Sequence, residues 1–179
     1  DNAPSEIIKG AVEAVNERND VCVILTGQED FPKTSQPSPE SFLTIFEDAK
    51  EKEDDVICVL LSSGLRGTCQ SAHLAKNMSE YDNIYIVDSL SATIGIKLIV
   101  NYANDLRNQG MSASNIVEKL EEVKTRIRIL AGVDTLEFLC RGGRVSRASA
   151  AIGELANIKP IITVTDEGSV AVAGKCLGK

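Results

Sequence analysis

The chain has 179 residues and a formal net charge of −7, with 26 Asp and Glu against 19 Lys and Arg, and 43% of its residues are hydrophobic. These values are typical of a globular protein with one domain, or with one domain and part of a second. The acidic balance and the aromatic content of 4% argue against nucleic acid or an anionic membrane as the main partner.

The cysteine and histidine content bears on metal binding and on compartment. The chain has five cysteines and one histidine but no CxxC pair, so we expect no metal site. Cys22 and Cys58 lie in apolar, strand-like runs, and we interpret them as reduced core residues of a cytoplasmic protein. No apolar run approaches the ~18 residues of a membrane span, so we expect no integral membrane association.

Helical and strand patterns alternate from the start of the chain. Residues 4–19 have helical spacing of apolar side chains, and residues 21–25 form a short apolar run that predicts a strand. After a loop, Ser38 is a good N-cap and Pro39 a good first residue for a helix that runs to about Lys52.

The central stretch of the sequence combines a strand, a polar loop and a helix. Residues 56–61 are six consecutive apolar residues, which predicts a strand buried on both faces. Ser62 to Thr68 form a loop with two serines and two glycines, and a helix follows from about Gly67 to Met78. Open α/β sheets bind ligands at such strand ends, and the loop amides, the hydroxyls and the helix dipole favour an anion.

The remaining pattern predicts a strand at 83–87, helices at 91–108 and from about 113 to 126, a strand at 127–133, a short helix at 134–140, a helix at 146–156, and a hairpin of strands 161–164 and 170–173. The alternation predicts an α/β fold over residues 1–133, mainly a parallel sheet flanked by helices. The hairpin departs from this pattern, so residues 134–179 are interpreted as part of a second α+β lobe.

Two hydroxyl pairs are candidate binding residues, and each has a simpler interpretation. Thr34 and Ser35 could hold an oxyanion near a strand end, or they could belong to an ordinary capped entry into a helix. Ser62 and Ser63 could let a ligand approach the backbone closely, or they could form a tight strand–helix turn. The loop lacks the spacing of a phosphate-binding Walker loop or of a nucleophile elbow.

Other polar residues give weaker signals. Asp88 and Ser89 could be site residues at a strand end, although we favour a helix N-cap. Arg141, beside two glycines, could present a guanidinium to a phosphate or carboxylate, or could belong to a plain helix-ending turn. We interpret His73 as structural and Arg66 as solvated, and no arrangement typical of acid–base or nucleophilic catalysis is evident.

Five motifs, taken together, resemble the motif series of the DegV family in order and approximate spacing. The resemblance covers Phe31 to about Val172. The motifs read Thr-Ser-Gln-Pro-Ser-Pro (34–39), Ser-Ser-Gly-Leu-Arg-Gly-Thr-Cys-Gln-Ser-Ala (62–72), Val-Asp-Ser-Leu-Ser-Ala-Thr-Ile-Gly (87–95), Thr-Leu-Glu-Phe-Leu-Cys-Arg-Gly-Gly-Arg-Val-Ser (135–146) and Asn-Ile-Lys-Pro-Ile-Ile (157–162). The resemblance implies a bacterial fatty-acid-binding protein, with the acyl chain in an apolar tunnel between two lobes and its carboxylate held by hydroxyls.

The resemblance also implies site residues and a partner. Thr34, Ser35, Ser62 and Ser63 match the hydroxyl positions that would bind the carboxylate. Some family members present the acid to a separate ATP-binding subunit of a fatty-acid kinase, so the chain itself would be non-catalytic, with no cofactor besides its lipid ligand. Arg141 falls in the family's basic motif, near where an acyl phosphate or the partner could be met.

Several positions depart from the family pattern. Arg66 and Cys69 stand where the family usually has Ser and Tyr, residues 1–30 match poorly, and the family's His-Gly segment is absent after Lys179. We therefore expect the chain to be incomplete. Two alternatives remain: a phosphotransferase-like enzyme for a small phosphorylated or hydroxylated substrate, related to dihydroxyacetone kinases, and an interaction module that has lost ligand binding.

Overall fold

The computed structural model describes residues 35–146 and 158–177. The chain divides into two units, Asp1–Ser35 and Gln36–Lys179, and the fold described below is that of the second unit. The helix expected at 4–19 and the strand expected at 21–25 lie outside the described residues, as does the helix expected at 146–156 apart from its first residue.

The first described helix is α2 (Pro39–Glu51), and it begins where the sequence predicts. Ser38 is its N-cap, with the side chain accepting a hydrogen bond from the Ser41 backbone N–H, and Pro39 occupies the first turn. Phe46 and Ala49 are buried, whereas Ile45 is 59% exposed. Ile45 therefore lies at the edge of the apolar stripe of this helix, outside its buried side.

Strands β1 (Val56–Leu60) and β2 (Ile84–Asp88) pair in parallel. Helix α3 (Thr68–Ser79) connects them, as expected for a βαβ unit. The five residues of β1 are only partly buried, which corrects the prediction of a strand buried on both faces. In the described part of the chain, β1 has a single neighbouring strand, β2, and thus incomplete cover.

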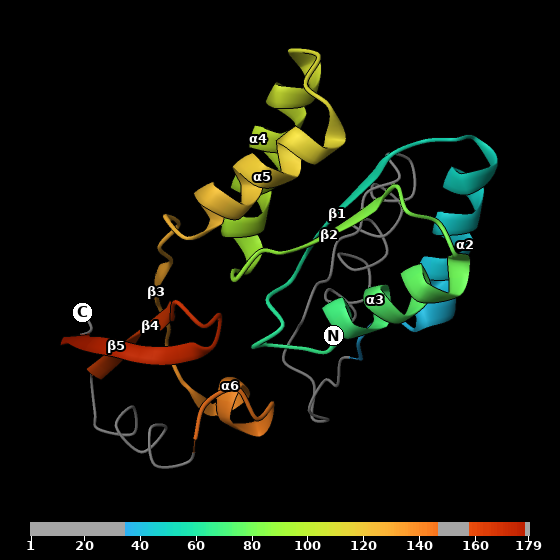
Figure 1. Cartoon of the computed structure of the whole chain (residues 1–179). Helices are drawn as coiled ribbons and strands as arrows, with labels where there is room; N and C mark the ends of the chain where they lie inside the picture. The colour runs from blue at the N-terminus through green and yellow to red at the C-terminus, as the bar shows by residue number, and fades with distance from the viewer. Residues whose placement is uncertain (1–34, 147–157, 178–179) are drawn as a thin grey trace, which may run out of the picture. The chain divides into compact units, whose positions relative to one another are not determined.

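Helices cover both faces of this sheet, so the arrangement has three layers (Figure 1). On one face, Phe46 of α2 and Ala75 of α3 pack with Ile84, and Val56, Cys58 and Ile86 join this cluster. On the other face, a cluster of Val87, Ile99, Leu106, Ile116 and Leu120 is joined by Ile57 and Val59. Alternate residues of each strand thus point to opposite faces, as the pleat of a β-strand requires.

The second cluster is built on α4 (Thr93–Asn108) and α5 (Ala113–Lys124). Gly110 has a φ of +81°, a left-handed conformation that suits glycine and ends α4 as the sequence predicts. Helix α5 ends at Lys124, two residues before the expected position.

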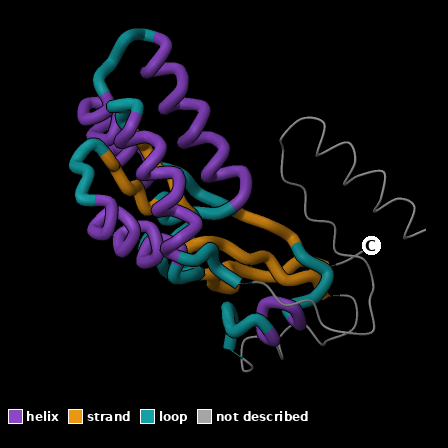
Figure 2. Tube along the Cα trace, turned by 90° about the vertical axis from the view of Figure 1, so that its right-hand side faces the viewer, coloured by secondary structure: helices purple, strands orange, loops and turns teal. Residues whose placement is uncertain are grey.

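The C-terminal elements form an antiparallel sheet in the order β3-β4-β5, coloured as strands in Figure 2. Strand β3 (Leu130–Gly132) is shorter than expected, while β4 (Ile158–Val164) and β5 (Val170–Leu177) are longer. Helix α6 (Glu137–Arg141) corresponds to the helix expected at 134–140, but it begins three residues later and ends one residue later. The mixture of a parallel α/β layer and an antiparallel sheet confirms the fold class, and the lobe boundary at residue 133 stays a prediction.

Candidate functional site

Two loops meet at the carboxyl edge of β1 and β2: the serine loop (Ser62–Gly67) and the β2–α4 loop (Ser89–Ala92). Leu60 and Asp88, the last residues of the two strands, are paired in register, so both loops leave the sheet at the same level. The Ser62 N–H donates to the Ser91 carbonyl (3.0 Å), and the Ser89 N–H donates to the Leu60 carbonyl (3.2 Å). These bonds continue the parallel pairing beyond the strands.

Asp88 joins the two loops through its side chain. Its Oδ1 accepts hydrogen bonds from the Ser63 N–H (3.2 Å) and from the Leu90 N–H (3.0 Å). Its Oδ2 lies 3.3 Å from the same Ser63 nitrogen. The preference for Asp88 and Ser89 as a helix N-cap was wrong: the N-cap of α4 is Ala92, which makes no side-chain capping bond.

Ser62 is fully buried and its hydroxyl has defined partners. Its Oγ donates to the Gly168 carbonyl (2.7 Å), in the turn between β4 and β5, and accepts from the Gly64 N–H (3.2 Å). A hydroxyl has a single proton to donate. In this structure, the hydroxyl proton of Ser62 is therefore used in the hydrogen bond to the Gly168 carbonyl.

Ser63 differs from Ser62 in being exposed. The backbone N–H of Ser63 is bound by Asp88, as described above, which fixes the residue at the edge of the sheet. Of the hydroxyls predicted to bind a carboxylate, that of Ser63 is thus presented to solvent at a defined position.

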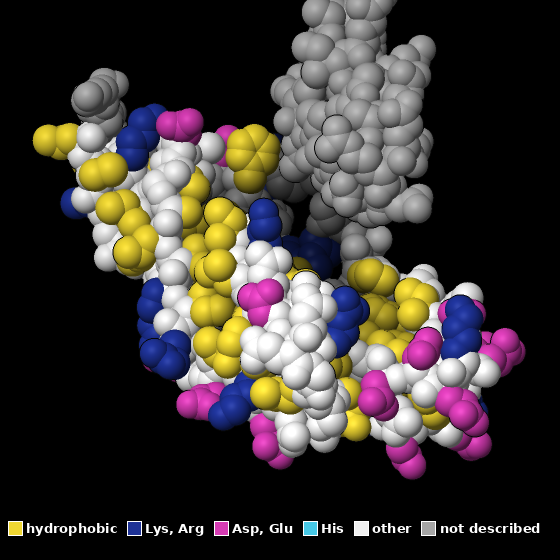
Figure 3. All heavy atoms as spheres, turned by 90° about the horizontal axis from the view of Figure 1, so that it is seen from above, with side chains coloured by type: hydrophobic (Ala, Val, Ile, Leu, Met, Phe, Trp, Pro, Cys, Tyr) yellow, Lys and Arg dark blue, Asp and Glu magenta, His cyan; other side chains and the backbone are white. Residues whose placement is uncertain are grey.

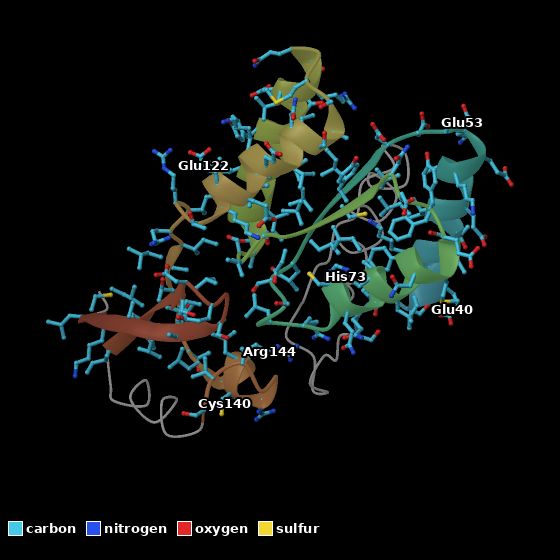
Figure 4. All side chains as sticks on the ribbon, viewed as in Figure 1. Glu40, Glu53, His73, Glu122, Cys140 and Arg144 are labelled. Carbon is cyan, nitrogen blue, oxygen red and sulfur yellow. The ribbon has the colours of Figure 1, made fainter. Side chains whose placement is uncertain are left out.

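The serine loop packs closely on the hairpin turn because two glycines lack a Cβ there. A Cβ added at Gly64 would lie 2.9 Å from the Glu167 oxygen, and one added at Gly168 would lie 2.0 Å from Ser62 Oγ. Arg144 makes a further contact, donating from Nη2 to the Leu65 carbonyl (3.1 Å), and Figure 4 shows it beside α6. Arg144 was missed by the sequence analysis, which singled out Arg141 in the same motif.

The first motif reaches the same region through Gln36. Its Nε2 donates to Ser71 Oγ (3.3 Å) on α3, and a Cβ at Gly67 would lie only 2.5 Å from its Oε1. Thr34 lies outside the described residues, and Ser35, which is exposed, is the last residue of the first unit. The motif residue that directly follows this hydroxyl pair thus contacts the start of α3.

Of the other candidate residues, Arg141 and His73 lie on helices outside the serine loop, whereas Arg66 lies within it. Arg141 ends α6 and forms an ion pair with Glu137, with 58% of its side chain exposed. His73 is exposed on α3 (Figure 4). Arg66, expected to be solvated, is partly buried.

Burial raises the pKa of two cysteine thiols on β1 and α3. It raises the pKa of Cys69 to about 11, with a smaller contribution from the Asp88 charge, and the Sγ donates to the Leu61 carbonyl (3.5 Å). Burial also raises the pKa of Cys58 to about 11. Both thiols are therefore protonated at neutral pH and are poor nucleophiles or metal ligands.

Within the described residues, no group of three or more His, Cys, Asp and Glu side chains could hold a metal ion. Of the helices described, none has the length and apolar character needed to cross a membrane.

Cavities lie among the described residues beside the β2–α4 loop and at the opposite end of the sheet. One of about 410 Å³ is at the amino end of β1, opposite the serine loop, and is lined by Ile57, Val100, Arg107, Met111 and others on α4 and α5. Another, of about 210 Å³, lies between Leu90, Ile127 and Thr165. Hydrophobic side chains also gather in patches on the face seen from above in Figure 3.

Parallel strands whose carboxyl ends carry polar loops, with helices on both faces, define the open α/β class of ligand-binding proteins. The profile of the DegV family matches residues 9–179. The chain belongs to the DegV family, which confirms the resemblance carried by the five motifs.

Curated relatives and solved structures agree. A DegV domain-containing protein of Caldanaerobacter subterraneus subsp. tengcongensis is 38% identical over 148 residues, covering 83% of this chain and 52% of the relative. A fatty-acid-binding DegV family protein from Thermus thermophilus is 39% identical with a TM-score of 0.73, over 83% of this chain and 52% of that one. The chain thus spans about half the length of the relatives it matches.

The Streptococcus pneumoniae Fatty Acid Kinase B3 protein, solved loaded with linoleic acid, is 29% identical with a TM-score of 0.74, over 84% of this chain and 54% of that one.

Proposed function

We propose that this protein binds a long-chain fatty acid, with the carboxylate at the serine loop and the acyl chain in an apolar tunnel. The observation that carries the proposal is Ser63: an exposed hydroxyl at the carboxyl edge of the parallel sheet, with its backbone N–H held by Asp88. The fatty acids in the Thermus and Streptococcus relatives support the ligand class.

The chemistry of the serine loop suits an anionic head group. It ends at the N-terminus of α3, where Gly67 caps the helix without a side-chain hydrogen bond. Amide groups and the positive end of the helix dipole stabilise negative charge at such a position. Several donors are needed to offset the dehydration of a buried carboxylate, which explains why the proposed site uses Thr34 and Ser35 as well as Ser62 and Ser63.

Ser62 and Ser63 have different parts in this proposal. Ser63 is a direct donor to the carboxylate. Ser62 can donate to the ligand only by giving up its bond to the Gly168 carbonyl, because its single proton is used there. In the geometry described, Ser62 shapes the loop and couples it to the hairpin turn.

The acyl chain supplies most of the favourable binding free energy in this proposal, at about 0.8 kcal/mol per buried CH₂ before offsetting terms. The chain spans about half of its relatives, and 52% of the Thermus protein is covered. We therefore propose the complete tunnel for the whole protein, with a second lobe that begins near residue 134.

We further propose that the protein presents the acid to a separate ATP-dependent kinase subunit and is itself non-catalytic. The name of the Streptococcus pneumoniae relative supports this partner. Arg141, exposed at the end of α6, is the candidate contact to an acyl phosphate or to the partner. A partner that consumes ATP implies a cytoplasmic location.

Titration of the purified protein with palmitic acid, followed by isothermal calorimetry, tests the proposal. We expect saturable binding, and a roughly tenfold loss of affinity in Ser63→Ala, as removal of one hydrogen bond to a charged group predicts. Ser114→Ala, an exposed serine on α5, is the matched control and should bind as the wild type does.

A wild-type protein that binds no fatty acid would contradict the proposed function. Binding that is unchanged in Ser63→Ala would place the carboxylate elsewhere. Turnover of a small phosphorylated substrate by the protein alone would favour the phosphotransferase alternative.

A further inference from the structure

We infer that Asp88 is a positioning residue for the carboxylate site: it holds the serine loop and the β2–α4 loop in one geometry and so fixes Ser63. The inference rests on the proposed function, because it concerns binding of the fatty-acid head group. It assigns to Asp88 an action through Ser63, without contact with the ligand.

The geometry of Asp88 is that of a bridge. Oδ1 accepts from both the Ser63 N–H (3.2 Å) and the Leu90 N–H (3.0 Å). Ser63 lies 25 positions and Leu90 two positions from Asp88 in the sequence. One carboxylate oxygen therefore connects the loops that follow β1 and β2. Because Leu60 and Asp88 are paired, the bridge sits directly at the ends of the two strands.

The β2–α4 loop has a conformation that needs such support. Leu90 has a φ of +49°, and Thr93, the first residue of α4, has a φ of +45°. Non-glycine residues with a left-handed backbone cost of order 1 kcal/mol or more, and such strain collects at functional sites. The bond to Leu90 holds this strained segment at its start, while the Ser89 hydroxyl and the Ser91 backbone hold it from within.

The charge of Asp88 does not favour a direct role with the ligand. A carboxylate close to a fatty-acid carboxylate would repel it, and like charges near each other weaken binding. The lone pairs of Oδ1 are directed to two main-chain N–H groups. The favourable contribution of Asp88 is therefore the loop geometry, and its charge is an opposing term.

Three variants test the loop geometry and the charge of Asp88 separately. Asp88→Ala removes both bonds and the charge. Asp88→Asn keeps one acceptor oxygen for the Oδ1 position and removes the charge together with the second oxygen, Oδ2, which lies 3.3 Å from the Ser63 nitrogen. Asp82→Ala is the matched control, since Asp82 is exposed in the turn before β2 and only its backbone carbonyl is bonded, to Lys76.

The experiment compares affinities for palmitic acid and for hexadecanol, which has the same chain with no carboxylate. For Asp88→Ala we expect a roughly tenfold loss of affinity for the acid and less than about a twofold change for the alcohol, since a misplaced Ser63 affects the charged head group most. Asp88→Asn should bind the acid as well as the wild type or more tightly, and Asp82→Ala should match the wild type.

Amide hydrogen exchange of the ligand-free protein gives a second readout. The Ser63 and Leu90 amides should exchange faster in Asp88→Ala than in Asp88→Asn, while the core amides of β1 stay protected. If Asp88→Ala does not fold, Asp88→Glu, which moves the carboxylate by one methylene, should produce the same selective loss.

Several results would overturn the inference while leaving the proposed function intact: unchanged acid binding in Asp88→Ala, equal losses for acid and alcohol, equal effects of Ala and Asn, or no change in Ser63 and Leu90 exchange. A wild-type protein that binds neither ligand would overturn the proposed function, and the role of Asp88 with it. The wild-type titration alone identifies that case.

Discussion

Gly168 illustrates how a single residue governs the packing beside the candidate site. It combines a φ of +78° with a carbonyl that accepts the Ser62 proton, and a Cβ there would lie 2.0 Å from Ser62 Oγ. Both the backbone conformation and the lack of space therefore require glycine.

Gly168→Ala should lower the free energy of unfolding by about 2–4 kcal/mol, because it adds a buried clash to the cost of a left-handed alanine. Gly110→Ala is the control, since Gly110 has a φ of +81° but nothing within 4 Å of the added Cβ. This variant should lose only about 1 kcal/mol. Urea unfolding of both proteins measures the difference, and equal losses would show that the close contact with Ser62 is unimportant.

The buried thiols predict a pH dependence. The pKa of both Cys58 and Cys69 is raised to about 11 from the ordinary 9.0, so the fold favours the protonated thiols. Their contribution to stability is complete below pH 9 and is lost as the pH rises through 11. Between these values, the free energy of unfolding should fall less steeply in a Cys58→Ala/Cys69→Ala double variant than in the wild type; parallel pH profiles would refute this.

Asp88 shows which properties of a single residue could be predicted from the sequence and which could not. Its place at the end of a strand was recognised as a possible site signal, but the helix-cap interpretation was preferred on local sequence alone. The hydrogen-bond partner that determines the role of Asp88 is the Ser63 N–H, which lies 25 residues away in the sequence. A local pattern carries no information on such a contact, and the same holds for Arg144 and Leu65.

At the scale of single elements, helix α2 offers a test of capping. The Ser38 Oγ accepts from the Ser41 N–H (3.4 Å), whereas Ser112, the N-cap of α5, makes no side-chain capping bond. Ser38→Ala should therefore destabilise the protein by about 0.5–1 kcal/mol. Ser112→Ala should cost less, and thermal unfolding of the two variants would contradict this account if their losses were equal.

Burial along the same helix leads to a second prediction about stability. Phe46 is completely buried, while Ile45, its neighbour, is 59% exposed. Phe46→Ala should lower the free energy of unfolding by about 3–5 kcal/mol, because it removes a large side chain and leaves a cavity. Ile45→Ala, measured in the same denaturant titration, should change it by well under half that amount, and similar losses would mean that the burial of α2 is assigned to the wrong face.

Elements with strong local signals were predicted well, and those that depend on pairing were not. The Ser38-Pro39 start of α2 and the glycine after α4 fix those ends within the local sequence. The run 127–133 looks like a strand, but only Leu130–Gly132 pairs with β4, since register and partner length set the limits of a strand. The hairpin was predicted, and its strands extend further than expected because they pair with each other over their whole length.

At the scale of the whole molecule, the candidate site depends on contacts between segments that are distant in the sequence. The Ser62 hydroxyl bonds to Gly168, and Arg144 bonds to Leu65, so the hairpin and the segment after α6 both support the serine loop. Ser62, Leu65 and Arg144 belong to the family motifs, whereas Gly168 lies outside them. The five motifs could therefore reveal the family from sequence, although the bonds that link them could not be derived from it.

The central claim is that this protein holds a fatty acid. Denaturing extraction of the purified protein, followed by mass spectrometry for free fatty acids, tests it most directly. We predict a stoichiometric long-chain acid in the extract of the wild type, and less in Ser63→Ala and Asp88→Ala. An extract without fatty acid, from protein that has also been incubated with palmitic acid before repurification, would contradict the account.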